Sequence, residues 1–251
     1  MNSSDWDAVA IRGKHYLFDV FFCRSKRRQI IQLIRQWDIT TGYKRVLKTD
    51  MFEEAIGGDG ILSFLSNRYG RIFCLDISLK VLDGARKKNS VCSAEYVLGD
   101  VRNPAFKDNT FDLIISNSTI DHFPQIDAAL QELRRILKPK GVLILTLHNR
   151  LQFAFSSMIF IKRLLKIKDY SYGYSYSYRN ICSRLLKAGF QVSESDYIYF
   201  FPPLITFLAS NCKGRLKRIL KRIFRIYENT VSSNKCLNRF AGSNIALRLV
   251  K

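Results

Sequence analysis

The sequence predicts an α/β fold of the Rossmann-like, doubly wound type. We expect a mostly parallel, seven-stranded sheet with helices on both faces, in a single domain with a C-terminal basic helical insertion. Short apolar segments alternate with amphipathic segments of helical period along most of the chain. The apolar segments are hydrophobic throughout, which is typical of parallel strands buried on both faces. A chain of 251 residues is long enough to bury the core of one such domain.

The expected elements follow one another in a regular order. Helices are predicted at residues 24–37, 60–68, 79–88, 126–137 and 178–188. Strands are predicted at residues 45–49, 71–76, 95–98, 111–117, 142–147, 190–200 and 244–250. Ser78 is expected to cap the N-terminus of one helix, Gly189 to end another and Pro139 to stop a third.

Nothing in the composition marks a linker between two domains. Residues 1–40 are interpreted as an N-terminal helical segment and residues 41–251 as the main domain. Within it, residues 41–150 would form the core, with substrate-side or lid insertions at about 151–177 and 201–240. The six cysteines are scattered without a CxxC pair, which predicts reduced thiols and no metal site.

The net charge of +20 is distributed unevenly. Residues 1–150 contain 23 Lys and Arg against 17 Asp and Glu, whereas residues 151–251 contain 18 against 4. Such an excess indicates an anionic partner: membrane lipid, nucleic acid or an acidic substrate. No apolar run is long enough to cross a membrane, and the acidic N-terminus does not resemble a secretory signal. We therefore expect a cytoplasmic protein, with peripheral contact at the inner membrane face as an added option.

Polar side chains follow nearly every predicted strand. In an open parallel sheet these strand ends lie at one edge, where ligands bind. Asp76 ends the second strand and Asp100 follows the third. A carboxylate after the second strand can accept hydrogen bonds from both ribose hydroxyls of a nucleoside. The alternative role for Asp76 is a cap of the helix that follows it.

Four segments of the chain resemble class I S-adenosylmethionine-dependent methyltransferases, in the order and spacing of that family. They are RIFCLDIS at 71–78, YVLGDV at 96–101, FDLIISNSTIDHF at 111–123 and ELRRILKPKGVLILTL at 132–147. The resemblance is greatest to the branch of ubiquinone, menaquinone and small-molecule methyltransferases.

The resemblance implies S-adenosylmethionine as the cofactor and assigns its contacts. Asp76, with Ile77 beside it, would bind the ribose. Asp100 and the backbone of Val101 would contact the adenine. The methionine end would lie against the residues after the fourth strand, Asn117 and Ser118.

The loop after the first strand departs from the family pattern. The family has a short GxGxG turn there, whereas the glycines of this chain come late, at Gly57, Gly58 and Gly60. Glu54 falls where the family has its acidic residue. Glu54, or its neighbours Asp50 and Glu53, would then lie near the amino group or sulfonium of the cofactor, and Gly58 would let the backbone approach it. The alternative is that the altered loop has lost cofactor binding.

Three residues are candidates for catalysis: Asp121, His122 and His148. Methyl transfer from a sulfonium depends chiefly on alignment and desolvation. A general base is needed when the acceptor is a hydroxyl or an acidic carbon that must lose a proton. The alternative is structural, with Asp121 and His122 capping the next helix and His148 bonded to backbone in a loop.

The substrate side is expected outside the sheet. Residues 151–168 and 197–209 are apolar, and residues 213–227 contain seven Lys and Arg and no acid. One face of the last segment collects its apolar side chains: Leu216, Ile219, Leu220, Ile223, Phe224 and Tyr227. Such a helix can lie on an anionic membrane surface, pack on its own domain with solvated charges, or contact RNA.

The function predicted from the sequence is therefore S-adenosylmethionine-dependent methylation of a small apolar or lipid-linked acceptor. Two alternatives stay open: an RNA methyltransferase that uses the basic C-terminal surface, and a methyltransferase-like binding protein without catalysis. The RNA alternative is weakened because the chain reads Asn117-Ser118-Thr119-Ile120 where a base-methylating enzyme would carry an Asn-Pro-Pro-Tyr-type motif.

Overall fold

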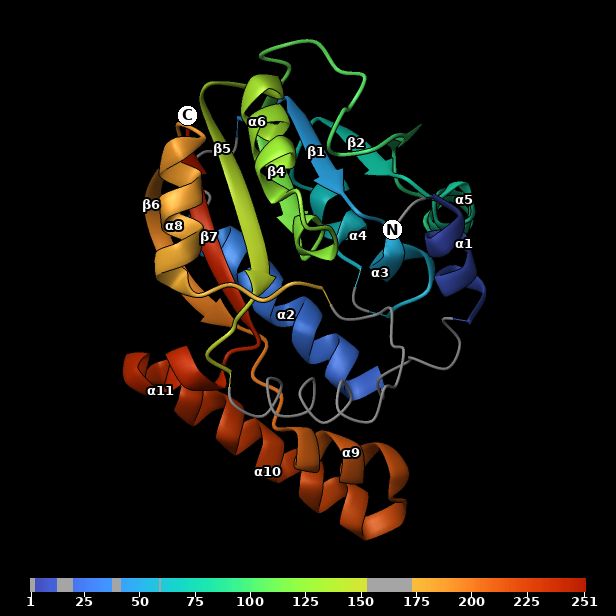
Figure 1. Ribbon diagram of the computed structural model, residues 1–251. Coiled ribbons are helices and arrows are strands. Elements are labelled where there is room, and N and C mark those ends of the chain that lie inside the picture. The colour runs from blue at the N-terminus through green and yellow to red at the C-terminus, as the bar shows by residue number, and fades with distance from the viewer. Residues whose placement is uncertain (1–2, 13–19, 38–41, 59, 153–172) are drawn as a thin grey trace.

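The computed structural model describes residues 3–12, 20–37, 42–58, 60–152 and 173–251, and these residues contain one seven-stranded sheet (Figure 1). Its strand order is β3-β2-β1-β4-β5-β7-β6. All neighbouring strands pair in parallel except β7, which is antiparallel to β5 and β6. The strands are β1 Arg45–Thr49, β2 Arg71–Asp76, β3 Ala94–Leu98, β4 Phe111–Asn117, β5 Leu137–His148, β6 Gln191–Ile198 and β7 Asn244–Val250. The predicted fold class is confirmed.

Helices cover both faces of the sheet, as the unbroken apolar strands predict. One face is covered by α2 (Val20–Trp37), α4 (Leu62–Ser66) and α5 (Leu79–Lys88), and the other by α6 (Ile126–Ile136) and α8 (Tyr178–Lys187). Neighbouring residues of one strand enter different cores: Val46 packs in the first and Leu47 in the second. Two separate hydrophobic cores therefore hold the sheet between the helix layers.

Two helix ends behave as the sequence predicts. The Ser78 hydroxyl accepts a hydrogen bond from the Val81 amide at 3.2 Å and caps α5. Gly189, at φ +83°, ends α8 in the left-handed conformation.

The start of β5 differs from the prediction of a strand at 142–147. The strand begins at Leu137, directly after α6, and pairs there with Phe111. The next paired residues are Leu113 and Val142, so an irregularity between the two pairs takes up residues 138–141. Pro139 stops the helix as expected, but the chain turns straight into the strand.

Other differences lie near the chain ends and in the first loop. The helix α1 (Ser3–Arg12) lies within the expected N-terminal helical segment but was not predicted as a separate helix. The short α3 (Phe52–Ala55) was not predicted, and α4 is shorter than the expected helix. Most of the expected insertion at 151–177 lies outside the described residues.

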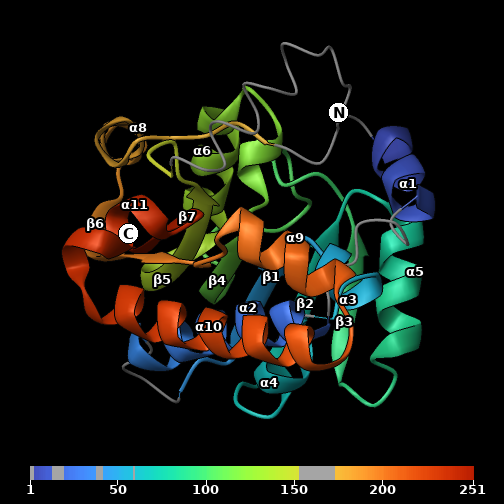
Figure 2. The same cartoon turned by 90° about the horizontal axis from the view of Figure 1, so that it is seen from below.

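A layer of three helices occupies the insertion between β6 and β7. It comprises α9 (Pro203–Asn211), α10 (Gly214–Ser233) and α11 (Lys235–Ala241). In Figure 1 the arrows of the parallel strands point down toward α9 and α10, and Figure 2 looks onto these helices with the sheet behind them. The layer therefore lies beyond the carboxyl edge of the sheet. Among the described residues, no helix is both long and apolar enough to span a membrane.

Candidate active site

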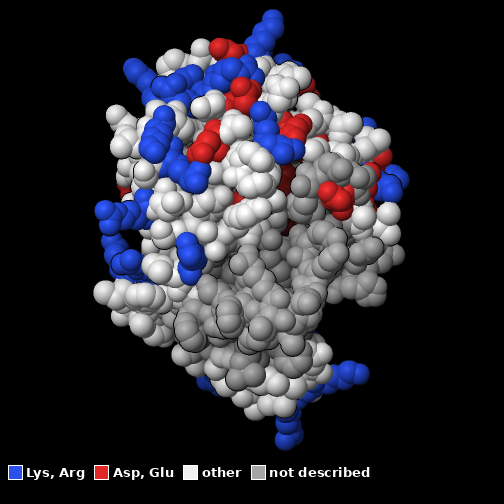
Figure 3. Space-filling view, in the orientation of Figure 1, with Lys and Arg blue, Asp and Glu red and all other residues white. Residues whose placement is uncertain are grey.

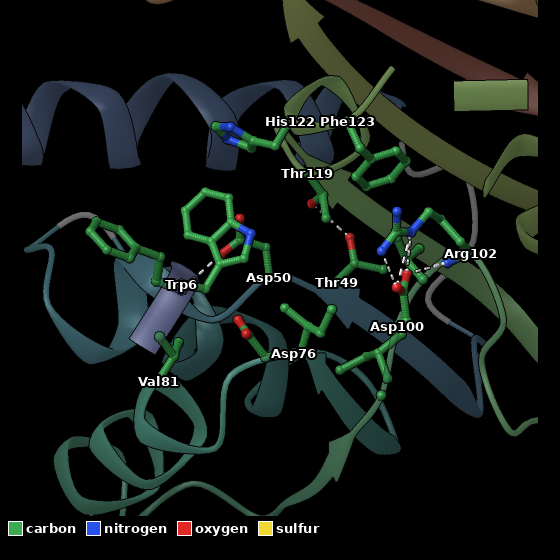
Figure 4. A pocket seen from close by; sticks show the side chains of 15 residues that line it. Trp6, Thr49, Asp50, Asp76, Val81, Asp100, Arg102, Thr119, His122 and Phe123 are labelled. Carbon is green, nitrogen blue, oxygen red and sulfur yellow. Dashed lines mark hydrogen bonds and ion pairs between the residues drawn. The ribbon is translucent and has the colours of Figure 1, made fainter. Parts of the chain in front are cut away.

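A cavity opens at the carboxyl ends of β1, β2, β3 and β4, where the sequence predicts ligand binding (Figure 4). The strand ends contribute polar and apolar wall residues: Thr49, Asp50, Asp76, Ile77, Asp100, Val101 and Thr119. Trp6 of α1 also lines it, so the N-terminal helix closes one side. About 60 Å³ is left between these side chains. A nucleoside is several times larger than that space, so its entry requires side chains such as Trp6 to move.

Asp76 ends β2 and is 9% exposed. Its Oδ2 accepts a hydrogen bond from the Met51 amide and its Oδ1 accepts one from the Ser78 amide, both at 2.8 Å. Burial raises the pKa of Asp76, although the two amides act in the opposite direction. Each carboxylate oxygen has a second lone pair, so Asp76 can still accept from two ribose hydroxyls. It also fastens the loop after β1 to the start of α5.

Asp100 carries an ion pair that the sequence did not predict. The Arg102 Nε donates to both carboxylate oxygens at 2.9 Å, and the guanidinium lies over the Phe123 ring at 4.9 Å. Burial alone would raise the pKa of Asp100, but the hydrogen bonds and charge of Arg102 lower it. Asp100 and the neighbouring Val101 both line the cavity, as expected for contacts to the adenine.

The loop after β1 makes its tight turn without glycine. Asp50 adopts φ +65°, and its amide donates to the Leu75 carbonyl at 2.9 Å. Its Oδ1 accepts from the Phe52 amide at 2.8 Å, at the start of α3. Asp is among the few residue types that tolerate this left-handed conformation. Burial and the charges of Glu53 and Asp76 raise the pKa of Asp50 well above its ordinary value.

Glu54 lies in an internal ion pair instead of the cavity wall. Its Oε2 is 2.9 Å from the Nζ of Lys48, a β1 residue that is 1% exposed. Its Oε1 accepts from the Ile61 amide at 2.9 Å. Burial lowers the pKa of Lys48, but the charges of the surrounding acids outweigh it and raise the pKa overall. Glu54 thus neutralises a buried lysine and fixes the start of α4.

The remaining first-loop candidates also lie outside the cavity lining. Glu53 Oε1 accepts from Lys26 at 3.2 Å and from Asn117 at 3.3 Å. Gly58 packs against Cys23 of α2, where an added Cβ would lie 3.5 Å from the Cys23 side chain. Of the four predicted loop contacts, only Asp50 faces the cavity.

Asn117 and Ser118 join the β4 end to its neighbours. Asn117 Oδ1 accepts from the hydroxyls of Thr146 and Tyr199, each at 2.8 Å. Ser118 Oγ accepts from Asn244 at 2.6 Å. Neither residue lines the cavity, and the next residue, Thr119, takes that place.

Thr119 and Thr49 were not predicted as site residues. Their hydroxyls are 2.8 Å apart across the ends of β4 and β1. Polar residues at both strand ends were the available signal. Trp6 was missed because nothing in its local pattern relates residue 6 to the sheet edge.

The structure brings the three catalytic candidates together. Asp121 is fully buried, and its Oδ2 accepts from the His148 amide at 2.9 Å and contacts His148 Nδ1 at 2.5 Å. Burial would raise the pKa of Asp121, but the charge and hydrogen bonds of His148 lower it. The Tyr174 amide donates to the Asp121 carbonyl at 2.5 Å, so the chain after residue 172 passes directly by this pair.

His122 connects this pair to the cavity. Its ring lies edge-to-face against His148, with 6.2 Å between centroids, and against Trp6 at 4.9 Å. Burial lowers the pKa of His122, which favours the neutral imidazole. Its Nδ1 is buried and has no hydrogen-bond partner among the described residues. The series Asp121, His148, His122 and Trp6 therefore runs from the protein interior to the cavity.

The residues that line the cavity suit a nucleoside cofactor. Asp76 offers acceptors for two ribose hydroxyls, Asp100 offers a carboxylate one strand further, and Ile77, Val101 and Phe123 supply apolar walls for a base. The acid at Asp50 adds negative charge on the side of β1. This arrangement suits a ligand that combines a nucleoside with a positive charge.

Comparisons with known proteins agree with this geometry. A family model described as a methyltransferase domain matches residues 53–145. An uncharacterized protein of Methanocaldococcus jannaschii is 28% identical over 181 residues, which cover 68% of this chain and 70% of that protein. The ubiquinone/menaquinone biosynthesis C-methyltransferase of Brucella canis is 33% identical over 144 residues, which cover 49% of this chain and 52% of that protein. The chain thus spans only about half of this second relative.

Solved structures give the same result for the fold. An S-adenosylmethionine-dependent methyltransferase of Mesorhizobium loti superimposes with a TM-score of 0.59 at 12% identity, covering 88% of this chain and 96% of that one. The family match, the relatives and the nucleoside-type site agree on the cofactor, which is S-adenosylmethionine. Residues 53–145 therefore match a methyltransferase domain, and the chain is similar to class I S-adenosylmethionine-dependent methyltransferases.

Proposed function

We propose that the protein methylates a hydroxyl or an acidic carbon of an apolar, lipid-like acceptor, and that His148 removes the acceptor proton. The observation that carries this proposal is the contact between the fully buried Asp121 carboxylate and His148 Nδ1 at 2.5 Å. A carboxylate in this position holds the imidazole in the tautomer that carries its proton on Nδ1. The lone pair of His148 is then on Nε2.

Bound S-adenosylmethionine supplies an electrophilic methyl group. The residues of this chain have two tasks: to align the acceptor and to take its proton. When His148 accepts that proton on Nε2, the ring becomes positively charged. The Asp121 carboxylate stabilises this charge because it is already ionised and shielded from water.

His122 has a positioning role in this scheme. Its ring lies between His148 and Trp6, and its lowered pKa keeps it neutral near pH 7. A neutral ring does not compete with His148 for positive charge.

The apolar character of the acceptor is supported by two observations. The Brucella canis relative is named a ubiquinone/menaquinone biosynthesis C-methyltransferase. In this chain, the segment that enters the C-terminal helix layer is aromatic and buried at Tyr199 and Phe200. Tyr199 reaches Asn117 at the end of β4 through its hydroxyl. An apolar wall thus leads from the helix layer to the sheet edge.

Transfer of tritiated methyl groups tests the proposal. The acceptors are a prenylated hydroquinone, a long-chain alkyl phenol and a water-soluble phenol, each supplied with the whole chain of 251 residues. Replacement of His148 by Gln should lower kcat by about 10²–10⁴-fold, which is the usual contribution of a general base. Replacement of Asp121 by Asn should lower it less, and His122→Gln least of the three.

Cofactor affinity provides the control. The Kd for S-adenosylhomocysteine should stay within about threefold in His148→Gln, because His148 does not line the cavity. If His148→Gln retains the wild-type kcat, His148 is not the base. Faster methylation of the soluble phenol than of both lipid-like acceptors would remove the proposed substrate class.

A further inference from the structure

The inner side of α10 is firmly attached to the domain. Phe224 is fully buried and packs with Phe22 in a third, smaller core. Glu228 is 4% exposed, accepts from Gln29 Nε2 at 2.7 Å and also bonds Ser25 and Arg28 of α2. These contacts fix the position of the helix, so its outer side is not needed for packing.

The outer side of α10 carries an exposed apolar stripe. Its four residues are spaced by three and four positions and are 44–60% exposed: Leu216, Ile219, Ile223 and Ile226. The sequence predicted one apolar face that includes Leu220 and Phe224, but the structure divides it. Leu220 and Phe224 pack inward, whereas the stripe faces solvent. A row of exposed aliphatic side chains on one helix indicates an interaction surface.

The surface beside the stripe is basic. Residues 213–227 contain seven Lys and Arg and no acid, and the acid that follows, Glu228, is turned inward. Arg218 and Arg222 lie on one flank of the stripe by helical spacing. In Figure 3, the lower end of the molecule shows projecting blue side chains and no red ones among its described atoms. The outer face of α10 thus combines apolar and positively charged groups.

A groove of about 340 Å³ lies between α10 and the start of α2. Its lining includes the cations Arg24, Arg28, Lys221 and Arg225, together with Phe21 and no acidic residue. The Lys221 ammonium and the Arg225 guanidinium lie over the Phe21 ring, at 5.0 and 5.3 Å from its centroid. Arg28 also pairs with Glu228. Several donors that converge on one groove suit a phosphate group.

We propose that the outer face of α10 docks on an anionic lipid bilayer. The stripe would enter the boundary between headgroups and acyl chains, and the exposed Arg215, Arg218 and Arg222 on its flank would contact the phosphates of lipid headgroups. The apolar stripe favours a bilayer over RNA, because a phosphate backbone offers nothing for aliphatic side chains to contact. The single sign of charge along the stripe matches an anionic surface.

The position of this surface connects it to the active site. Figures 1 and 2 show α10 beyond the carboxyl edge of the sheet, the edge that holds the cavity and the Asp121–His148 pair. A bilayer bound to α10 would lie on the side from which a lipid-like acceptor must arrive. Docking itself does not depend on the proposed function, so the two can fail separately.

Vesicle flotation with the full-length protein tests the docking. Vesicles of phosphatidylcholine with 30% phosphatidylglycerol should bind it at about 0.1 M salt, a concentration at which charges near a surface are only partly screened. Vesicles of phosphatidylcholine alone should bind it weakly. The double variant Arg218→Gln and Arg222→Gln should reduce the partition coefficient about 30-fold. The matched control removes the same charge from exposed positions on α5, through Lys87→Gln and Lys88→Gln, and should bind like wild type.

Tryptophan quenching tests whether the stripe enters the bilayer. The variant I223W adds tryptophan fluorescence to that of the wild type. Lipids brominated on their acyl chains should quench this added fluorescence. The control V91W places the ring at a loop residue that is 95% exposed, and should not be quenched. Equal binding of the Arg218→Gln, Arg222→Gln double variant and wild type, absence of quenching in I223W, or binding to RNA without binding to anionic vesicles would each overturn the proposal.

Discussion

The end of β2 and the loop after β1 face the same cavity but are built in different ways. At the end of β2, the Asp76 carboxylate alone faces the cavity. It accepts hydrogen bonds from the backbone amides of Ser78, two residues away, and of Met51 in the neighbouring loop. In the β1 loop, the acids form contacts with buried Lys48 and with α2, and a left-handed Asp50 makes the turn. The first site depends on one carboxylate, and the second is a network of charged side chains. This difference teaches that a strand-end acid can be recognised from sequence, whereas the target of a loop acid depends on which neighbour is buried.

Replacement of Lys48 by Met should have the largest effect. It leaves the buried carboxylates of Glu54 and Glu53 without their internal cation, and loss of one partner of a buried ion pair typically costs about 3–5 kcal/mol. Urea unfolding measures the loss. The double variant Lys48→Met and Glu54→Gln should recover part of it, because the second change removes the uncompensated charge.

The control for this change is Lys138→Met. Lys138 pairs with Asp112 at 2.7 Å, but its side chain is 36% exposed, so solvent screens the pair. The expected loss is below about 1 kcal/mol. If Lys48→Met loses no more than Lys138→Met, the β1 network does not hold the loop, and the contrast between the two strand ends disappears.

Replacement of Asp76 by Ala should have the next largest effect, on cofactor affinity. Two hydrogen bonds to an ionised carboxylate contribute about 1.5 kcal/mol each, which corresponds to an approximately 100-fold increase in Kd. Calorimetry with S-adenosylhomocysteine measures it. Asp83→Ala, which removes an exposed acid from α5, is the matched control and should leave the Kd unchanged. A Kd within threefold of wild type in Asp76→Ala would show that β2 does not bind the ribose.

Much of the fold could be predicted because it depends on local patterns. β1, β2, β4 and β7 have the predicted limits, since buried strands are rich in apolar residues. β5 could not be delimited, because its first pair, Leu137 with Phe111, is separated from the rest by an irregularity. Helix α3 was missed because its four residues are too few to show a helical period.

The site was predictable where a residue's role follows from its strand. Asp76, Asp100 and the Asp121–His148 pair all lie at the predicted edge. The roles of Glu54 and Asn117 could not be predicted, because their partners, Lys48 and Tyr199, are 6 and 82 positions away in the chain and only burial selects them. Trp6 is the extreme case, since its contact with His122 joins positions more than a hundred residues apart.

Replacement of Asp50 by Asn should have the smallest effect on the free energy of unfolding. This effect should depend on pH. The pKa of Asp50 is raised in the folded state, first by burial and then by Glu53 and Asp76. The folded protein therefore holds this proton at pH values where the unfolded chain has released it. Ionised Asp50 lowers stability above the folded-state pKa, and the penalty disappears as the pH falls below the ordinary value near 4. Asn tolerates the left-handed conformation and keeps the acceptor for the Phe52 amide.

The Asn variant should thus be more stable than wild type at pH 8 and equally stable at pH 4, in denaturant unfolding at each pH. The difference should be smaller than the loss in Lys48→Met, because Lys48 still neutralises part of the acid cluster around Asp50. A constant difference between the two proteins at all pH values would mean that Asp50 does not titrate with a raised pKa. In that case the acid cluster of the β1 loop would be fully compensated by Lys48 and Lys26.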